Sequence, residues 1–145
     1  MAMLPFCGYN MGDYFAHWLK MGRTLSRPPR IFHVNWFRTG HDGRFLWPGF
    51  GENLRVLMWM IARVKGTAAG TETPIGVVPA ADALNVDGLD LGRADVERLL
   101  RVDRDEWAAE VPEIRAFFDR FGDRLPAELS RALESLSLHV TTATV

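Results

Sequence analysis

The sequence has little that would indicate a secreted or membrane protein. It contains a single cysteine, so no internal disulfide can form, which fits a reducing compartment. No run of about 18 uncharged apolar residues occurs, and the start of the chain lacks the basic and apolar segments of a signal peptide. These absences predict a cytoplasmic protein with no membrane partner.

Charge of one sign and the common catalytic motifs are also scarce. The 17 basic and 18 acidic residues nearly cancel, whereas a nucleic-acid-binding surface needs a basic excess, so no nucleic-acid partner is expected. The four histidines do not cluster with cysteines or carboxylates at metal-ligand spacing. No G-x-x-x-x-G-K-[ST] loop, Ser-His-Asp set or nucleophile elbow occurs. The sequence therefore predicts neither a metal site nor catalytic residues within this chain.

Aromatic residues and glycines, in contrast, crowd into the stretch from Asn35 to Asn53. It holds three phenylalanines, two tryptophans and four glycines. Glycine is kept where a backbone must turn or approach something closely, and aromatic faces can stack on a planar ring. One interpretation is a loop that holds a nucleobase, and the other is a small aromatic core under a hairpin. From composition alone the two interpretations are equally favoured.

Apolar spacing predicts a mixed α/β fold, with short strands and an aromatic hairpin loop packed by about five helices. The predicted helices cover Asn10–Met21, Leu54–Lys65 and Arg93–Arg101, then a segment from Asp103 that Pro112 kinks or splits, and a last segment after Pro126. Arg30–Phe37 is predicted as a strand, Asp42-Gly43 as a turn that lets Phe37 and Phe45 approach, and Thr71–Pro79 as at best an edge strand.

Helix ends and faces are also predicted. Asn10 and Asn53 are expected as N-caps, Gly22 as a left-handed stop, and Gly66 as the end of the helix Leu54–Lys65. The first helix should bury Met11, Tyr14, Phe15 and Trp18. The helix Leu54–Lys65 is apolar nearly all round and should be buried, since a helix with no polar face needs partners on all sides.

Two segments of the aromatic stretch, Asn35–Arg38 and Gly43–Asn53, resemble the guanine-binding segment of GTP-dependent phosphoenolpyruvate carboxykinase. Further segments resemble the same family in the same order: Pro5–Asn10 with His17-Trp18, Thr73–Gly76 with Pro79, Asp103–Trp107 and Phe121–Pro126. The resemblance runs from Pro5 to about Leu138, and the tail His139–Val145 falls outside it. Its length and composition make it far more specific than a lone glycine motif.

The resemblance implies a site and a fold. Phe37 and Phe50 would sandwich the guanine ring, Phe45 would pack at its edge, and groups of Phe50, Gly51, Glu52 and Asn53 would read its polar edge. The fold would be the C-terminal fragment of the carboxykinase nucleotide-binding domain. Residues 1–145 would form a single partial domain, with 5–79 as the guanine-pocket portion and 92–140 as the C-terminal helical portion.

The resemblance also implies an activity. The family converts oxaloacetate and GTP to phosphoenolpyruvate, carbon dioxide and GDP in gluconeogenesis, with Mn²⁺ and Mg²⁺, and the parent enzyme is expected to be monomeric. Its phosphate loop, metal ligands and lid lie before the segment matched here. The chain is thus expected to bind GTP or GDP, to meet oxaloacetate or phosphoenolpyruvate only through that missing region, and to be inactive alone.

Two alternatives stay open, a stand-alone guanine-nucleotide-binding module and an inactive remnant. Arg38 and Arg44 lie within the aromatic stretch, on either side of the Asp42-Gly43 turn, and can be either phosphate ligands or surface charges.

Overall fold

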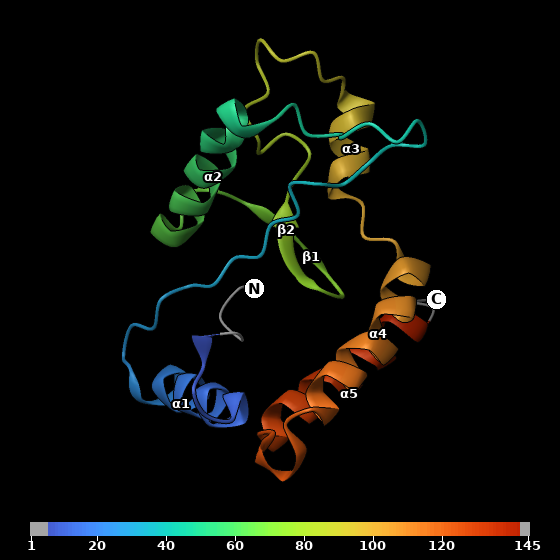
Figure 1. Cartoon of the computed structure of the whole chain (residues 1–145). Coiled ribbons are helices and arrows are strands. Elements are labelled where there is room, and N and C mark those ends of the chain that lie inside the picture. Colours follow the sequence, from blue (N-terminus) through green and yellow to red (C-terminus); the bar gives the residue numbers. More distant parts are fainter. Residues whose placement is uncertain (1–5, 143–145) are drawn as a thin grey trace. The chain divides into compact units, whose positions relative to one another are not determined.

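The computed structural model describes residues 6–142 (Figure 1). Pro5, where the resemblance begins, and the last three residues of the tail His139–Val145 therefore lie outside the described residues. The chain divides into two compact units. One consists of the described residues up to Pro29 together with those from Asp103 onward, and the other is Arg30–Val102. This division groups the first helix with the C-terminal helices, so its boundaries differ from the two portions expected from the sequence.

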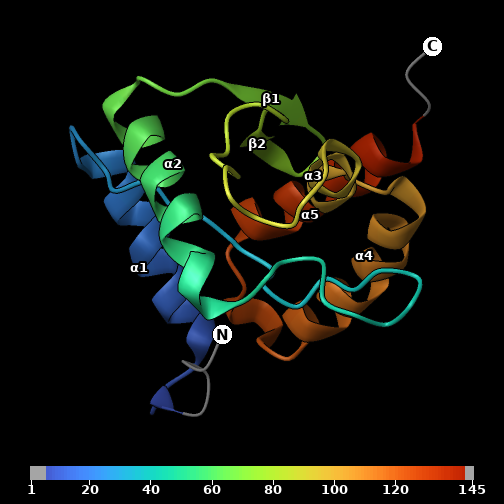
Figure 2. The same cartoon turned by 90° about the horizontal axis from the view of Figure 1, so that it is seen from above.

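The first unit is helical and contains α1 (Met11–Thr24), α4 (Arg104–Asp119), the short 3₁₀ helix η3 (Gly122–Arg124) and α5 (Ala127–Thr141). α4 and α5 lie side by side and antiparallel (Figures 1 and 2). Val111, Leu133 and Val140 are buried between them, and the ring of Trp107 covers this cluster. Pro112 does not split α4, because the neighbouring Val111 is held in this core despite the hydrogen bond that proline removes.

The start of α1 follows the prediction and its end does not. Asn10 caps the helix by accepting a hydrogen bond from the Gly12 N–H at 2.8 Å, and its Nδ2 donates to the Phe121 carbonyl. Gly22 does not stop α1, which continues to Thr24 and ends at an extended Leu25. Trp18 was predicted to be buried but is 48% exposed. It lies at the far end of the face whose first turn is buried.

The second unit holds the 3₁₀ helix η2 (Phe50–Glu52), α2 (Asn53–Lys65), β1 (Gly70–Thr73), β2 (Gly76–Pro79) and α3 (Arg93–Leu100). β1 and β2 form an antiparallel hairpin with Thr73 opposite Gly76. The sequence predicted at best one edge strand there, because proline cannot donate to a sheet. The turn places Pro74 outside the ladder, and Gly76 takes the positive φ of 116° that follows.

The predicted strand Arg30–Phe37 is wrong, since no strand is assigned to this segment. The predicted alternation nevertheless holds, because Phe32, Val34 and Trp36 are half-buried while the residues between them are exposed. Extended backbone alternates its side chains whether or not it is hydrogen-bonded to a neighbour. The periodicity therefore indicated the extended conformation, but it carried no information on whether another segment pairs with this one.

α2 ends as predicted at Gly66, which has a φ of 75°. The prediction that α2 is buried on all sides is wrong for the described residues, where Trp59 is its one buried side chain. An apolar stripe on α2 is exposed by 44% to 63%: Leu54, Leu57, Met58, Ile61 and Val64. We refer to these five residues as the α2 stripe. Among residues 6–142, no helix is both long and apolar enough to cross a bilayer.

The α2 stripe leads us to expect that the purified chain self-associates and binds a hydrophobic dye, because contiguous exposed apolar surface favours association. Replacing Ile61 with Glu should lower both signals, since it places a charge within the stripe. Leu138→Glu is the matched control, because Leu138 is 64% exposed but lies on α5 outside the stripe. Dye fluorescence and sedimentation velocity measure the two effects. A monomer that binds no dye at high concentration would contradict this expectation.

Candidate functional site

The aromatic stretch forms a hairpin-like loop that brings two of the predicted site residues together. The Leu46 N–H donates to the Arg38 carbonyl at 2.8 Å and the Gly40 N–H to the Arg44 carbonyl at 2.9 Å. Gly43 closes the turn with a φ of 74°, which a side chain would strain. The rings of Phe37 and Phe45 consequently meet edge to face, with centroids 5.8 Å apart. The predicted approach of these two residues is confirmed.

Phe50 lies apart from the Phe37–Phe45 pair in the chain, at the start of η2. Gly49 has a φ of 133° and redirects the chain there. The Phe50 side chain is 91% exposed and makes no ring contact among the described residues, while Phe37 and Phe45 are 71% and 62% exposed. Three large apolar rings thus remain open to solvent within fourteen positions, Phe37 to Phe50. These three exposed rings do not form a small aromatic core, whereas the rings of Trp36 and Trp47 lie close together, with centroids 6.2 Å apart.

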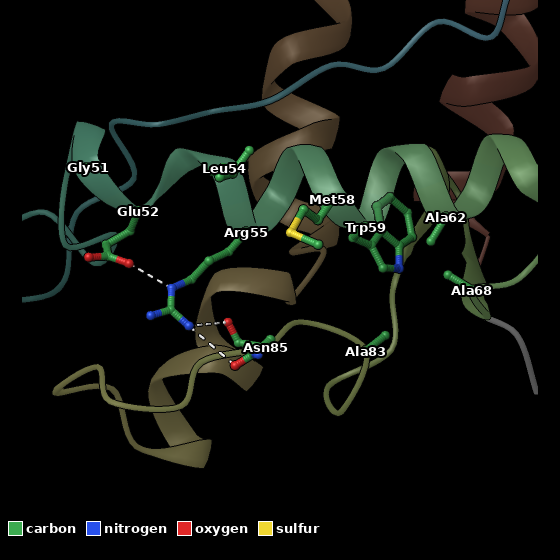
Figure 3. A pocket seen from close by; sticks show the side chains of 10 residues that line it. All are labelled: Gly51, Glu52, Leu54, Arg55, Met58, Trp59, Ala62, Ala68, Ala83 and Asn85. Carbon is green, nitrogen blue, oxygen red and sulfur yellow. Dashed lines mark hydrogen bonds and ion pairs between the residues drawn. The ribbon is translucent and has the colours of Figure 1, made fainter.

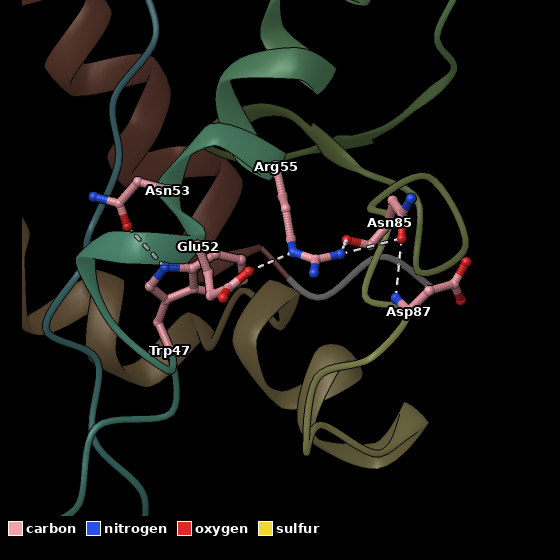
Figure 4. Close-up of polar contacts among 6 residues, drawn as sticks. All are labelled: Trp47, Glu52, Asn53, Arg55, Asn85 and Asp87. Atoms are coloured by element: carbon pink, nitrogen blue, oxygen red, sulfur yellow. Dashed lines mark hydrogen bonds and ion pairs between the residues drawn. The ribbon is translucent and has the colours of Figure 1, made fainter.

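Asn53 differs from its predicted role as a helix cap. η2 runs directly into α2, so Asn53 already has helical dihedral angles, and Glu52 takes the N-cap position without a side-chain capping bond. The Oδ1 of Asn53 instead accepts a hydrogen bond from the buried Trp47 Nε1 at 2.9 Å (Figure 4). Its Nδ2 points away from the indole. The Asn53 side chain is therefore held by a hydrogen bond to Trp47, which the spacing of residues in the sequence does not predict.

Glu52 and Gly51 occupy the turn between Phe50 and Asn53. The Glu52 carboxylate accepts from Arg55 Nε at 2.6 Å, and Arg55 in turn donates to the backbone carbonyl and side chain of Asn85 (Figure 4). Gly51 is exposed, and a Cβ added to it would meet nothing within 4 Å. One oxygen of the Glu52 carboxylate is thus paired with Arg55, and the backbone of this turn is exposed at Gly51.

A groove of about 510 Å³ runs along α2, and Gly51 and Glu52 of the aromatic stretch are among the residues that line it. Its lining includes Leu54, Met58 and Trp59 on one side and Ala83 and Asn85 on the other (Figure 3). The Glu52–Arg55–Asn85 contacts close one end of it. None of Phe37, Phe45 and Phe50 lines this groove. Sequence reasoning missed Arg55 and Asn85, because thirty positions separate them and no motif links them.

The two flanking arginines differ in their surroundings. Arg38 donates through Nη1 to the carbonyls of Leu99 and Arg101, at 3.2 and 2.7 Å, which ties the loop to the C-terminal end of α3. Arg44 is 89% exposed at its side chain, and its Nε lies 3.8 Å from the Asp42 carboxylate. A second hollow of about 450 Å³ beside Phe45 is lined by Arg44, Arg98 and Asp95 among others. Arg38 thus has a structural contact, whereas the exposed Arg44 side chain lines this second hollow.

No group of three or more histidine, cysteine or carboxylate side chains among residues 6–142 is arranged to hold a metal ion. The described part of the chain offers aromatic faces and hydrogen-bonding groups around the loop.

Comparison with known proteins gives one consistent result. The sequence model of a family described as phosphoenolpyruvate carboxykinase C-terminal P-loop domain matches residues 1–139. Phosphoenolpyruvate carboxykinase [GTP] of Arthrobacter sp. (strain FB24) is 53% identical over 138 residues, which are 94% of this chain and 23% of that protein. The protein of the same name from Neocallimastix frontalis is 50% identical over 145 residues, covering 98% of this chain and 24% of the relative. The chain thus spans about a quarter of these relatives.

Proposed function

The chain belongs to the GTP-dependent phosphoenolpyruvate carboxykinase family, and from this premise we propose that it supplies the guanine-binding pocket of such an enzyme. Phe37 and Phe50 stack on the base, Phe45 contacts its edge, and the Phe50–Asn53 turn recognises its polar groups. The single observation that carries this proposal is the exposure of the three phenylalanine rings on one short loop. Apolar rings that are largely exposed to solvent are suited to stack on a planar ligand.

Stacking supplies affinity but little selectivity, because every nucleobase has a π-face. Guanine must therefore be chosen by donors and acceptors fixed at the base edge, which stay unpaired when the wrong base binds. Gly51 and Glu52 contribute backbone groups to this edge, and Asn53 contributes a half-buried carboxamide. These residues form the selective part of the proposed site.

The proposed activity of the whole enzyme is conversion of oxaloacetate and GTP to phosphoenolpyruvate, carbon dioxide and GDP, in the cytoplasm, with Mn²⁺ and Mg²⁺. The described residues of this chain do not fit those metal ions, and its sequence has no P-loop motif. We therefore assign no catalytic step to its residues. A stand-alone guanine-nucleotide-binding module is the second candidate, and the open aromatic loop favours it equally.

Titration calorimetry with guanosine, GDP, GTP and ATP tests the proposal. Guanosine, GDP and GTP should bind with affinities within about tenfold of one another, or roughly 1.4 kcal/mol. The reason is that the sequence has no phosphate-binding loop motif to bind the additional phosphates of GDP and GTP. ATP should bind more weakly, because its base offers the wrong edge. Equal affinity for ATP and GTP would contradict the assignment of a guanine-binding site.

A further inference from the structure

The contact between Trp47 and Asn53 fixes which way round the Asn53 carboxamide lies. An indole N–H can only donate a hydrogen bond, so the atom facing it at 2.9 Å has to be the carbonyl oxygen Oδ1. The reverse orientation would set two donors against each other and leave the N–H of a tryptophan that is only 7% exposed without a partner. The buried indole therefore imposes one orientation on the amide (Figure 4).

This orientation leaves only donors at the free end of the side chain. Within residues 6–142, Asn53 Nδ2 donates to no protein atom, and it points away from the indole (Figure 4). An unconstrained asparagine can present either its oxygen or its nitrogen to a ligand. Asn53 presents N–H groups, because its oxygen is already engaged.

A donor at this place discriminates between the two purines. Guanine carries the acceptor O6 at the position where adenine carries the amino donor N6. A fixed N–H group pairs with O6 but meets the adenine amino group donor to donor. Resting on the guanine site proposed above, we propose that Trp47 is a positioning residue for base selectivity. It holds Asn53 with its donors free for a purine that has a carbonyl at C6.

Replacing Trp47 with Phe tests this inference, because the substitution removes the indole N–H and keeps an aromatic ring. The Asn53 amide is then free to turn, so guanosine should bind more weakly and adenosine more strongly. The guanosine-to-adenosine affinity ratio should fall by about three- to tenfold, the size expected for one net hydrogen bond. Inosine, which shares O6 but lacks the 2-amino group, should weaken by the same factor as guanosine.

Trp36→Phe is the matched control. It removes an indole from the same aromatic pair, yet Trp36 makes no hydrogen bond among the described residues, so the ratio should stay unchanged. The ratio also cancels any change in the folded fraction, since both nucleosides are titrated into one preparation. A double-mutant cycle completes the test. In an Asn53→Ala background, Trp47→Phe should leave the ratio unaltered, because a residue that acts through Asn53 has nothing left to orient.

Each outcome has one interpretation. If the original chain does not prefer guanosine, the proposed guanine site itself is wrong, and with it this inference. If it does prefer guanosine but Trp47→Phe weakens both nucleosides in parallel, Trp47 is only structural and the inference alone is overturned. The inference is likewise overturned if guanosine weakens and inosine does not, because the contact then involves the 2-amino group. A reciprocal change that vanishes without Asn53 supports the inference.

Discussion

The purified chain is expected to form no phosphoenolpyruvate from oxaloacetate, GTP and Mn²⁺. Transfer of a phosphoryl group depends on metal ions and fixed cations that neutralise the developing charge. The described residues include no cluster able to hold a metal, and the sequence contains no G-x-x-x-x-G-K-[ST] loop. A pocket that binds only the base supplies neither metal ions nor a phosphate-binding loop. We therefore expect no turnover by this chain, rather than a slow rate.

A coupled assay that follows phosphoenolpyruvate formation measures this directly. A full-length carboxykinase in the same buffer shows that the coupling enzymes and the Mn²⁺ concentration support turnover. Addition of this chain to that enzyme provides a second control, because an inhibitor in the preparation would slow the positive reaction. Turnover above background that scales with the concentration of this chain would refute the prediction.

Replacement of Phe50 with Ala should weaken guanosine binding by roughly 1–3 kcal/mol, the usual range when a base-stacking aromatic is lost. Phe50 is 91% exposed, so the substitution removes almost no packing and the chain should fold as before. Affinity should therefore fall while the unfolding transition stays where it is. Calorimetric titration and thermal melting without ligand measure the two quantities.

Phe6→Ala is the matched control for Phe50→Ala, because Phe6 is a comparably exposed ring, at 82%, that lies outside the aromatic loop. It should leave guanosine affinity unchanged. Phe50→Trp should retain binding, since it keeps a flat face at the same position. A Phe50→Ala variant that binds as tightly as the original chain would show that Phe50 does not stack on the base.

Sequence reasoning predicted best those features that depend on local chemistry. Asn10 caps α1 and Gly66 ends α2 because a side-chain acceptor and a left-handed glycine suit those places whatever surrounds them. The Asp42-Gly43 turn likewise brings Phe37 and Phe45 together. The strand at Arg30–Phe37 failed because a strand needs a partner, and alternation along one segment carries no information about a neighbour.

The same distinction applies to the candidate site. The crowding of aromatic rings and glycines indicated the loop itself, and the resemblance indicated which of its residues to test. The partners of the polar side chains were not predictable. Asn53 looked like a cap, but the 3₁₀ turn before α2 shifts the helix start, and its oxygen is bonded to Trp47. Glu52 was expected to read the base edge, but its carboxylate accepts a hydrogen bond from Arg55, which also donates to Asn85 thirty positions away.

The most direct test of the guanine pocket follows the aromatic ring protons of Phe37, Phe45 and Phe50 by NMR while guanosine or adenosine is added. A stacked purine shifts nearby ring protons through its ring current, so guanosine should move the signals of these three residues together. Adenosine should do so only at higher concentration. The proposed pocket is contradicted if the shifts occur instead at Met58 and Trp59 in the groove along α2, or if the two nucleosides shift the loop signals at equal concentrations.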